Sequence, residues 1–326
     1  MSPSAKLPPP PYLFVPPLTP FKEDLSVDFP ALQREIDFVL ETSPSAVISV
    51  AAVETQEYQY LSHEQRIDLI RATVESVAGR VATFVGVTHP NLHVSLELAE
   101  LAASLGAAGI QALVPLRPFG GPPSLDDLLR YFQALGESAL PVCVYHNPGP
   151  GADPPLAWLI KLAELPHVEF FKESSRDLRR VGYLIEQIED AGLAHYLTTM
   201  QMLAASLCLG GSGATMPPPA SALGGRIIEA FQRGDLQEVW ELQKGFQMFP
   251  AAWMHKGLAP VMKAAMSIIG IELGEPFPPY EGLSRTERDE VAEHLKRYGL
   301  ARAASRRSPG KSTAGAKSPA KSVPHG

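Results

Sequence analysis

The sequence has few cysteines, no long apolar run and no leader-like beginning, and each of these absences narrows the class of protein. Cys143 and Cys208 are the two cysteines among 326 residues, too few for a disulfide framework, so we expect a reducing compartment, the cytoplasm. No uninterrupted apolar run reaches membrane-spanning length, and we expect no membrane partner. Prolines interrupt the stretch MSPSAKLPPPPYLF, which argues against a signal peptide and predicts an extended N-terminal arm over residues 1–11.

Acidic residues are absent from the last segment of the chain. Residues 301–326 contain six basic residues, so residues 1–300 hold a net charge of −13 against −7 for the whole chain. The Ser-, Ala-, Pro- and Lys-rich composition of this segment predicts a disordered basic tail. A solvated tail without a specific role and a contact with nucleic acid or another anionic surface both fit this composition. The acidic body argues against nucleic-acid binding as the main activity.

Apolar runs typical of strands alternate with amphipathic runs typical of helices along most of the chain. The strand candidates are residues 12–18, 46–53, 81–87, 109–115, 141–147, 168–174, 195–200 and 211–216. This alternation predicts a parallel sheet covered by helices. Eight repeats favour a closed (β/α)8 TIM barrel, which we place at residues 12–235. No G-x-G-x-x-G follows the first candidate strand, which argues against a dinucleotide site. Residues 236–300 show only helical spacing and predict a C-terminal helical extension.

A lysine and a tyrosine stand at the ends of two neighbouring candidate strands. The active site of such a barrel lies at the carboxyl ends of its strands, so Lys172 and Tyr145 should meet there. At the ordinary pKa of about 10.4, roughly one lysine in 2,500 is neutral at pH 7, whereas burial lowers the pKa and makes the amine nucleophilic. We therefore predict Schiff-base chemistry at Lys172, with the phenol of Tyr145 as a proton shuttle. The alternative is that Lys172 pairs with an acid on the barrel rim.

Several stretches resemble, in the same order, the motifs of a known family. They are LTPF (18–21), VETQEYQYLSHEQR (53–66), VYHNP (144–148), FFKESSRD (170–177), GGSGATM (210–216) and VMKAAMSIIG (261–270). From about residue 12 to 300 the chain resembles the N-acetylneuraminate lyase and dihydrodipicolinate synthase family of class I aldolases. The resemblance implies a (β/α)8 barrel, commonly a homotetramer, that acts on 2-oxo acids without a metal or other cofactor. It also implies that Lys172 forms the Schiff base.

The sequence departs from the family pattern in the loops that hold the substrate. The family's paired threonines, which bind the substrate carboxylate and supply a hydroxyl to a tyrosine proton relay, correspond to Glu54 and Thr55. We predict that Thr55 is a relay or carboxylate-binding hydroxyl. Glu54 is either a site carboxylate, as an acid or base or as a hydrogen-bond acceptor for a hydroxyl-rich or cationic substrate, or a residue that faces away and forms a salt bridge with a helix. Arg117 replaces a tyrosine of the synthase and Pro150 replaces an arginine, so we expect a divergent member rather than the synthase itself.

Further substrate contacts are predicted at two other places. Arg117 could bind an anionic substrate group at the barrel mouth or lie at a subunit interface. Gly213 and Ala214, on the eighth candidate strand, could offer backbone groups to the substrate. His89 and His93 are four residues apart, but no third ligand follows at a clear spacing, so we predict no metal site.

These features together predict an enzyme. We expect a Schiff-base-forming lyase, an aldolase or a dehydratase, that acts on a 2-oxo acid or a related small carbonyl compound through Lys172. We expect it to assemble as a homo-oligomer, a dimer or a tetramer. The alternative is a non-catalytic barrel, a sensor or scaffold in which the aldolase site has decayed.

Overall fold

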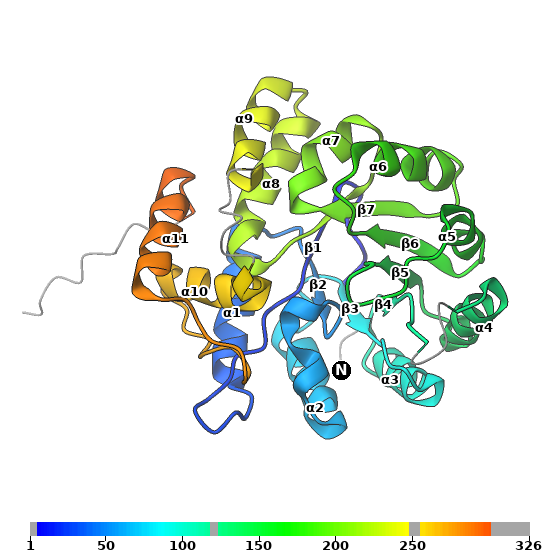
Figure 1. Ribbon diagram of the computed structural model, residues 1–326, viewed down its shortest axis with the longest axis horizontal. Helices are drawn as coiled ribbons and strands as arrows, with labels where there is room; N and C mark the ends of the chain where they lie inside the picture. The colour runs from blue at the N-terminus through cyan, green and yellow to red at the C-terminus, as the bar shows by residue number, and fades with distance from the viewer. Residues whose placement is uncertain (1–4, 118–122, 248–254, 301–326) are drawn as a thin grey trace, which may run out of the picture.

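Eight parallel strands close into a barrel in the computed structural model, which describes residues 5–117, 123–247 and 255–300 (Figure 1). The strands follow one another in chain order, and the last pairs with the first. Their bounds are β1 (Tyr12–Val15), β2 (Val47–Val50), β3 (Thr83–Gly86), β4 (Gly109–Leu113), β5 (Val142–His146), β6 (Val168–Glu173), β7 (His195–Thr199) and β8 (Gly213–Thr215). Every strand lies inside one of the predicted runs, so the predicted (β/α)8 barrel is confirmed.

Helices surround the barrel, because each amphipathic run buries its apolar face against the strands (Figure 1). These helices are α1 (Phe29–Thr42), α2 (His63–Val77), α3 (Leu92–Ser104), α4 (Leu125–Leu135), α5 (Leu156–Ala163), α6 (Leu178–Leu184), α7 (Leu203–Cys208) and α8 (Pro218–Gln232). Three more follow, α9 (Leu236–Gln247), α10 (Leu258–Ile269) and α11 (Arg285–Arg297). Both α9 and α10 pack on α8, and α11 packs on α10, so the predicted C-terminal helical extension is confirmed.

Local sequence signals set where several helices begin. Ser62, Ser124 and Ser284 precede α2, α4 and α11, and each hydroxyl accepts a hydrogen bond from the backbone N–H three residues later. The side chain at that third position reaches back to the serine N–H, which completes a capping box.

An apolar layer fills the barrel below the strand ends. Phe14, Phe84 and Phe170 meet there with ring centroids 5.0 to 5.7 Å apart, beside the buried thiol of Cys143. Side chains two residues apart on a strand share a face. Lys172 therefore lies on the same face of β6 as Phe170, next to this apolar layer.

Two further predictions concern membrane-spanning segments and the basic tail. Within the described ranges, no helix combines the length and apolar character needed to cross a membrane. The basic tail, residues 301–326, lies outside the described residues.

Candidate active site

A cavity of about 610 Å³ opens at the carboxyl ends of the strands. Its lining includes Lys172 from β6, Tyr145 from β5, and Glu54 and Thr55 from the short 3-10 turn η1 (Glu54–Gln56) that follows β2. The structure thus brings together four of the residues that the sequence singled out, although β2 and β6 are more than 100 residues apart.

The amine of Lys172 is buried against an aromatic ring. The residue is 5% exposed, and its Nζ lies 3.5 Å from the centroid of the Tyr145 ring. Burial lowers the pKa of Lys172 to about 8, although the carboxylate of Glu54 opposes the shift. At that pKa about one amine in ten is neutral at pH 7, some two hundred times the neutral fraction of an ordinary lysine. The position therefore favours a nucleophilic amine over an ion pair at the rim.

The phenol of Tyr145 is joined to Glu54. Its Oη donates a hydrogen bond to Glu54 Oε2 at 2.7 Å and accepts one from Asn147 Nδ2 at 2.9 Å. Burial raises the pKa of Tyr145 well above its ordinary value, and the neighbouring Glu54 raises it further. The phenol therefore keeps its proton at neutral pH and directs it at a carboxylate. Glu54 does not turn away from the barrel, so the salt-bridge alternative for this residue is wrong.

Thr55 also lines the cavity, but its place in the network differs from the prediction. The phenol of Tyr145 bonds to Glu54 and Asn147, so the carboxylate occupies the position in which the sequence suggested the hydroxyl of Thr55. Thr55 is thus available as a substrate contact rather than as the partner of Tyr145.

Gln56 holds the loop that carries these two residues. It is buried, and its Oε1 accepts hydrogen bonds from the N–H groups of Ala52 at 2.7 Å and Val53 at 3.1 Å. Its Nε2 donates to the carbonyls of Pro17 at 2.8 Å and Ser49 at 3.0 Å. Since one amide satisfies four backbone groups, Gln56 fixes the shape of the loop.

Three predicted substrate contacts lie elsewhere. The exposed guanidinium of Arg117 is paired with Asp127 at the start of α4 and does not line the cavity. Gly213 and Ala214 begin β8, so they lie one layer below the strand ends, where Thr215 and Met216 line the cavity instead. Gly213 serves the close pairing of β8 with β1, because a Cβ there would lie 2.1 Å from the carbonyl oxygen of Tyr12.

Other cavity residues escaped the sequence analysis. The hydroxyls of Thr199 and Thr215 are buried without a hydrogen-bond partner, and both residues line the cavity. Arg176, from the loop after β6, contributes an exposed guanidinium to the lining. The sequence contained a signal for these two threonines, because Thr199 and Thr215 are the last residues of β7 and β8, and the active site of such a barrel lies at the strand ends.

A buried charged cluster braces the strands behind Lys172. Glu173 points to the opposite face of β6 and accepts hydrogen bonds from Arg180 Nε at 3.0 Å and from Tyr196 Oη at 3.2 Å. His146 Nδ1 lies 3.2 Å from the same carboxylate. His146 follows Tyr145 on β5, so its side chain points to the opposite face of the strand. The cluster ties the end of β5 to the end of β6, and so fixes Tyr145 relative to Lys172.

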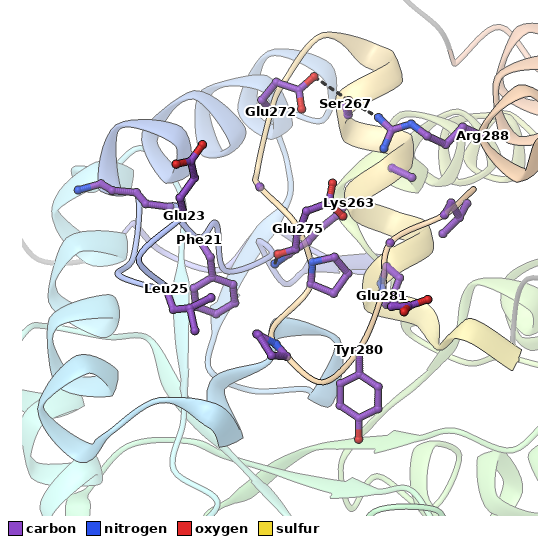
Figure 2. Close-up of a pocket in the computed structure, with 18 residues that line it drawn as sticks. Phe21, Glu23, Leu25, Lys263, Ser267, Glu272, Glu275, Tyr280, Glu281 and Arg288 are labelled. Atoms are coloured by element: carbon purple, nitrogen blue, oxygen red, sulfur yellow. Dashed lines mark hydrogen bonds between the residues drawn. The ribbon is translucent and has the colours of Figure 1, made fainter. Parts of the chain in front are cut away.

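A second cavity, of about 570 Å³, lies between the β1–α1 loop, α10 and the segment that follows α10 (Figure 2). It shares no lining residue with the first. Lys263 on its wall forms a buried ion pair with Glu57 at 2.6 Å, and Glu57 Oε1 accepts a hydrogen bond from the N–H of Phe277. This ion pair connects the loop after β2 to α10, and so helps to hold the turn that contains Glu54.

Comparison with known proteins agrees with this architecture. Residues 11–298 match the model of the Dihydrodipicolinate synthetase family. The chain is 27% identical over 288 residues to a 4-hydroxy-tetrahydrodipicolinate synthase of Moorella thermoacetica, covering 87% of this chain and 96% of that protein. A synthase of Archaeoglobus fulgidus with the same name is 29% identical, with the same two coverages.

Solved structures of the family share the fold. YagE, a prophage protein of Escherichia coli K12 solved in complex with pyruvate, aligns with a TM-score of 0.82 at 22% identity, over 89% of this chain and 98% of its own. A dihydrodipicolinate synthase of Aquifex aeolicus aligns with a TM-score of 0.79 at 22% identity and the same coverages. With nearly its whole length matched, the chain belongs to the dihydrodipicolinate synthetase family, as a divergent member.

Proposed function

We propose that the protein is a Schiff-base-forming lyase, an aldolase or a dehydratase, that acts on a 2-oxo acid or a related small carbonyl compound. The observation that carries the proposal is the amine of Lys172, buried on an apolar floor at the mouth of the barrel with its pKa lowered to about 8. A lysine in this setting is a nucleophile rather than a structural cation.

The geometry gives each residue a role in such a reaction. The neutral amine of Lys172 adds to the substrate carbonyl to give a carbinolamine, and uptake of one proton with loss of water leaves an iminium ion. In an aldolase the iminium accepts the electron pair of the C–C bond that breaks. In a dehydratase it accepts the electron pair of an α C–H bond whose proton is removed, and the resulting enamine expels a hydroxyl group, which leaves as water with a proton. Tyr145, whose ring touches Nζ and whose proton faces Glu54, moves protons between the substrate and that carboxylate. Thr55, which also lines the cavity, supplies a hydroxyl to the substrate.

Reductive trapping tests the proposal. The protein is incubated with a panel of 2-oxo acids and simple aldehydes, reduced with borohydride, and digested for mass analysis. The complex of YagE with pyruvate is a reason to include pyruvate in the panel. We expect an adduct at Lys172 and none at that position in a Lys172→Met variant, with the exposed Lys161 as an internal measure of non-specific reduction. If no carbonyl compound labels Lys172, the proposal fails and the non-catalytic barrel becomes the better account.

We also propose that the protein assembles as a homo-oligomer in the cytoplasm. Family membership and the scarcity of cysteine support this. Sedimentation equilibrium measures the assembly, and a sedimenting mass of 35.2 kDa, that of one chain, would contradict it.

A further inference from the structure

We propose that Glu54 makes the cavity select carbonyl substrates that carry a hydroxyl group beside the carbonyl, in preference to substrates that carry a carboxylate there. The inference rests on the proposed function, since it concerns the substrate bound at Lys172. It narrows that function from 2-oxo acids towards the related small carbonyl compounds, by naming the group that stands next to the reacting carbon.

The hydrogen bonding of Glu54 leaves one oxygen for a ligand. Oε2 is occupied by the phenol of Tyr145, whereas Oε1 is buried and has no hydrogen-bond partner. An ionised carboxylate accepts hydrogen bonds and donates none. A substrate group that satisfies Oε1 must therefore be a donor, and a substrate carboxylate, which is also an acceptor, cannot fill that role.

The need for a hydrogen-bond donor applies next to the reacting carbon, because Glu54 lies close to Lys172. The ring of Tyr145 contacts Lys172 Nζ on its face and bonds to Glu54 through its oxygen, so one phenol separates the amine from the carboxylate. The proposal places a group attached directly to the carbon that bonds to Nζ in this space between the amine and Glu54. Glu54 is the one acidic side chain among the described residues that line the cavity. A second carboxylate beside it would meet like-charge repulsion in a poorly solvated site.

Apart from Arg176, the one guanidinium in the described lining, two hydroxyl groups of the cavity fit a hydroxylated ligand. The buried hydroxyls of Thr199 and Thr215 have no partner of their own, and each can both donate and accept. They stand at the ends of β7 and β8. A substrate with several hydroxyl groups satisfies these atoms, which otherwise remain unpaired in a buried place.

A matched pair of probes isolates the group in question. Hydroxyacetone and pyruvate both present a methyl ketone, and they differ in carrying a hydroxymethyl group or a carboxylate. Each is trapped at Lys172 with borohydride, and its initial rate is divided by its rate with free Nα-acetyl-lysine, which removes intrinsic reactivity. We expect the normalised rate to favour hydroxyacetone at least about tenfold in the unaltered protein.

Substitution of Glu54 should weaken that preference. We expect Glu54→Thr, which restores the hydroxyl of the family pattern, to lower the hydroxyacetone-to-pyruvate ratio at least about tenfold. Glu54→Gln, which keeps an acceptor oxygen but loses the charge, should lower it at least about threefold. Glu64→Gln, an exposed carboxylate on α2, is the matched control and should leave the ratio unchanged.

The outcomes separate this inference from the proposed function. A smaller initial preference, or a ratio that stays the same in both Glu54 variants, overturns the role of Glu54 while the adducts still support the lyase. Failure of the unaltered protein to form an adduct with any carbonyl overturns both. Circular dichroism identifies a variant that does not fold, and the other substitution then decides the result.

Discussion

The lowered pKa of Lys172 predicts a specific pH profile for adduct formation. The attacking species is the neutral amine, and its population follows a pKa of about 8 rather than the ordinary 10.4. The neutral fraction is then about 1% at pH 6, about 9% at pH 7 and about 90% at pH 9. The rate of adduct formation should rise nearly tenfold from pH 6 to 7 and level off above about pH 9.

The assay uses propionaldehyde, which carries neither a carboxylate nor a hydroxyl, so that substrate preference does not enter. Aliquots are taken at each pH, reduced at one common pH, and quantified as the labelled peptide that contains Lys172. Glu54→Gln provides an internal check, because Glu54 raises the pKa of Lys172 and its neutralisation should move the midpoint to lower pH. A rate that keeps rising tenfold per pH unit up to pH 10 would refute the reasoning, since it would show an ordinary, solvated lysine.

Four further predictions follow from contacts described above. Tyr145→Phe should still form the adduct but should slow exchange of the substrate's α-protons in D2O, followed by NMR, about 10²- to 10⁴-fold. In the unaltered protein the free energy of unfolding, measured in urea, should rise by up to about 3 kcal/mol between pH 8 and 10.4, because only the unfolded lysine binds a proton in that range. Lys172→Met should abolish this rise. Lys263→Met should lower the free energy of unfolding by about 3–5 kcal/mol, because it leaves Glu57 buried and unpaired, and Glu57→Gln added to it should recover part of the loss. Gly213→Ala should lower the melting temperature sharply in calorimetry, since φ is +143° and the added Cβ would strike the carbonyl of Tyr12.

The sequence was sufficient to predict the barrel and the place of Lys172 in it for a physical reason. Each strand is a short apolar run bounded by turn residues, and strand order in a closed parallel barrel follows chain order. The positions of Lys172 and Tyr145 on adjacent strands could therefore be deduced before any coordinates. The same logic did not serve for Gly213 and Ala214, because they are the first two of the three residues of β8 and the strand ends at Thr215.

What the sequence could not supply were contacts made by side chains across the fold. The choice of Glu54 over Thr55 as partner of Tyr145 depends on the turn geometry of η1, which local propensity does not determine. The pairing of Arg117 with Asp127 depends on how the chain enters α4. Glu57 and Lys263 lie about 200 residues apart, and nothing in either segment alone indicates that they meet.

Gln56 makes this site well suited to directed evolution. The side-chain amide of Gln56 holds the backbone of the turn through four hydrogen bonds. The side chains at positions 54 and 55 can therefore change without loss of the bonds that give the turn its shape. A combinatorial library at positions 54 and 55 should therefore retain a high proportion of folded clones and sample new substrates. Randomising position 56 would instead leave four buried backbone groups unpaired, and most such clones would be lost before any selection for activity.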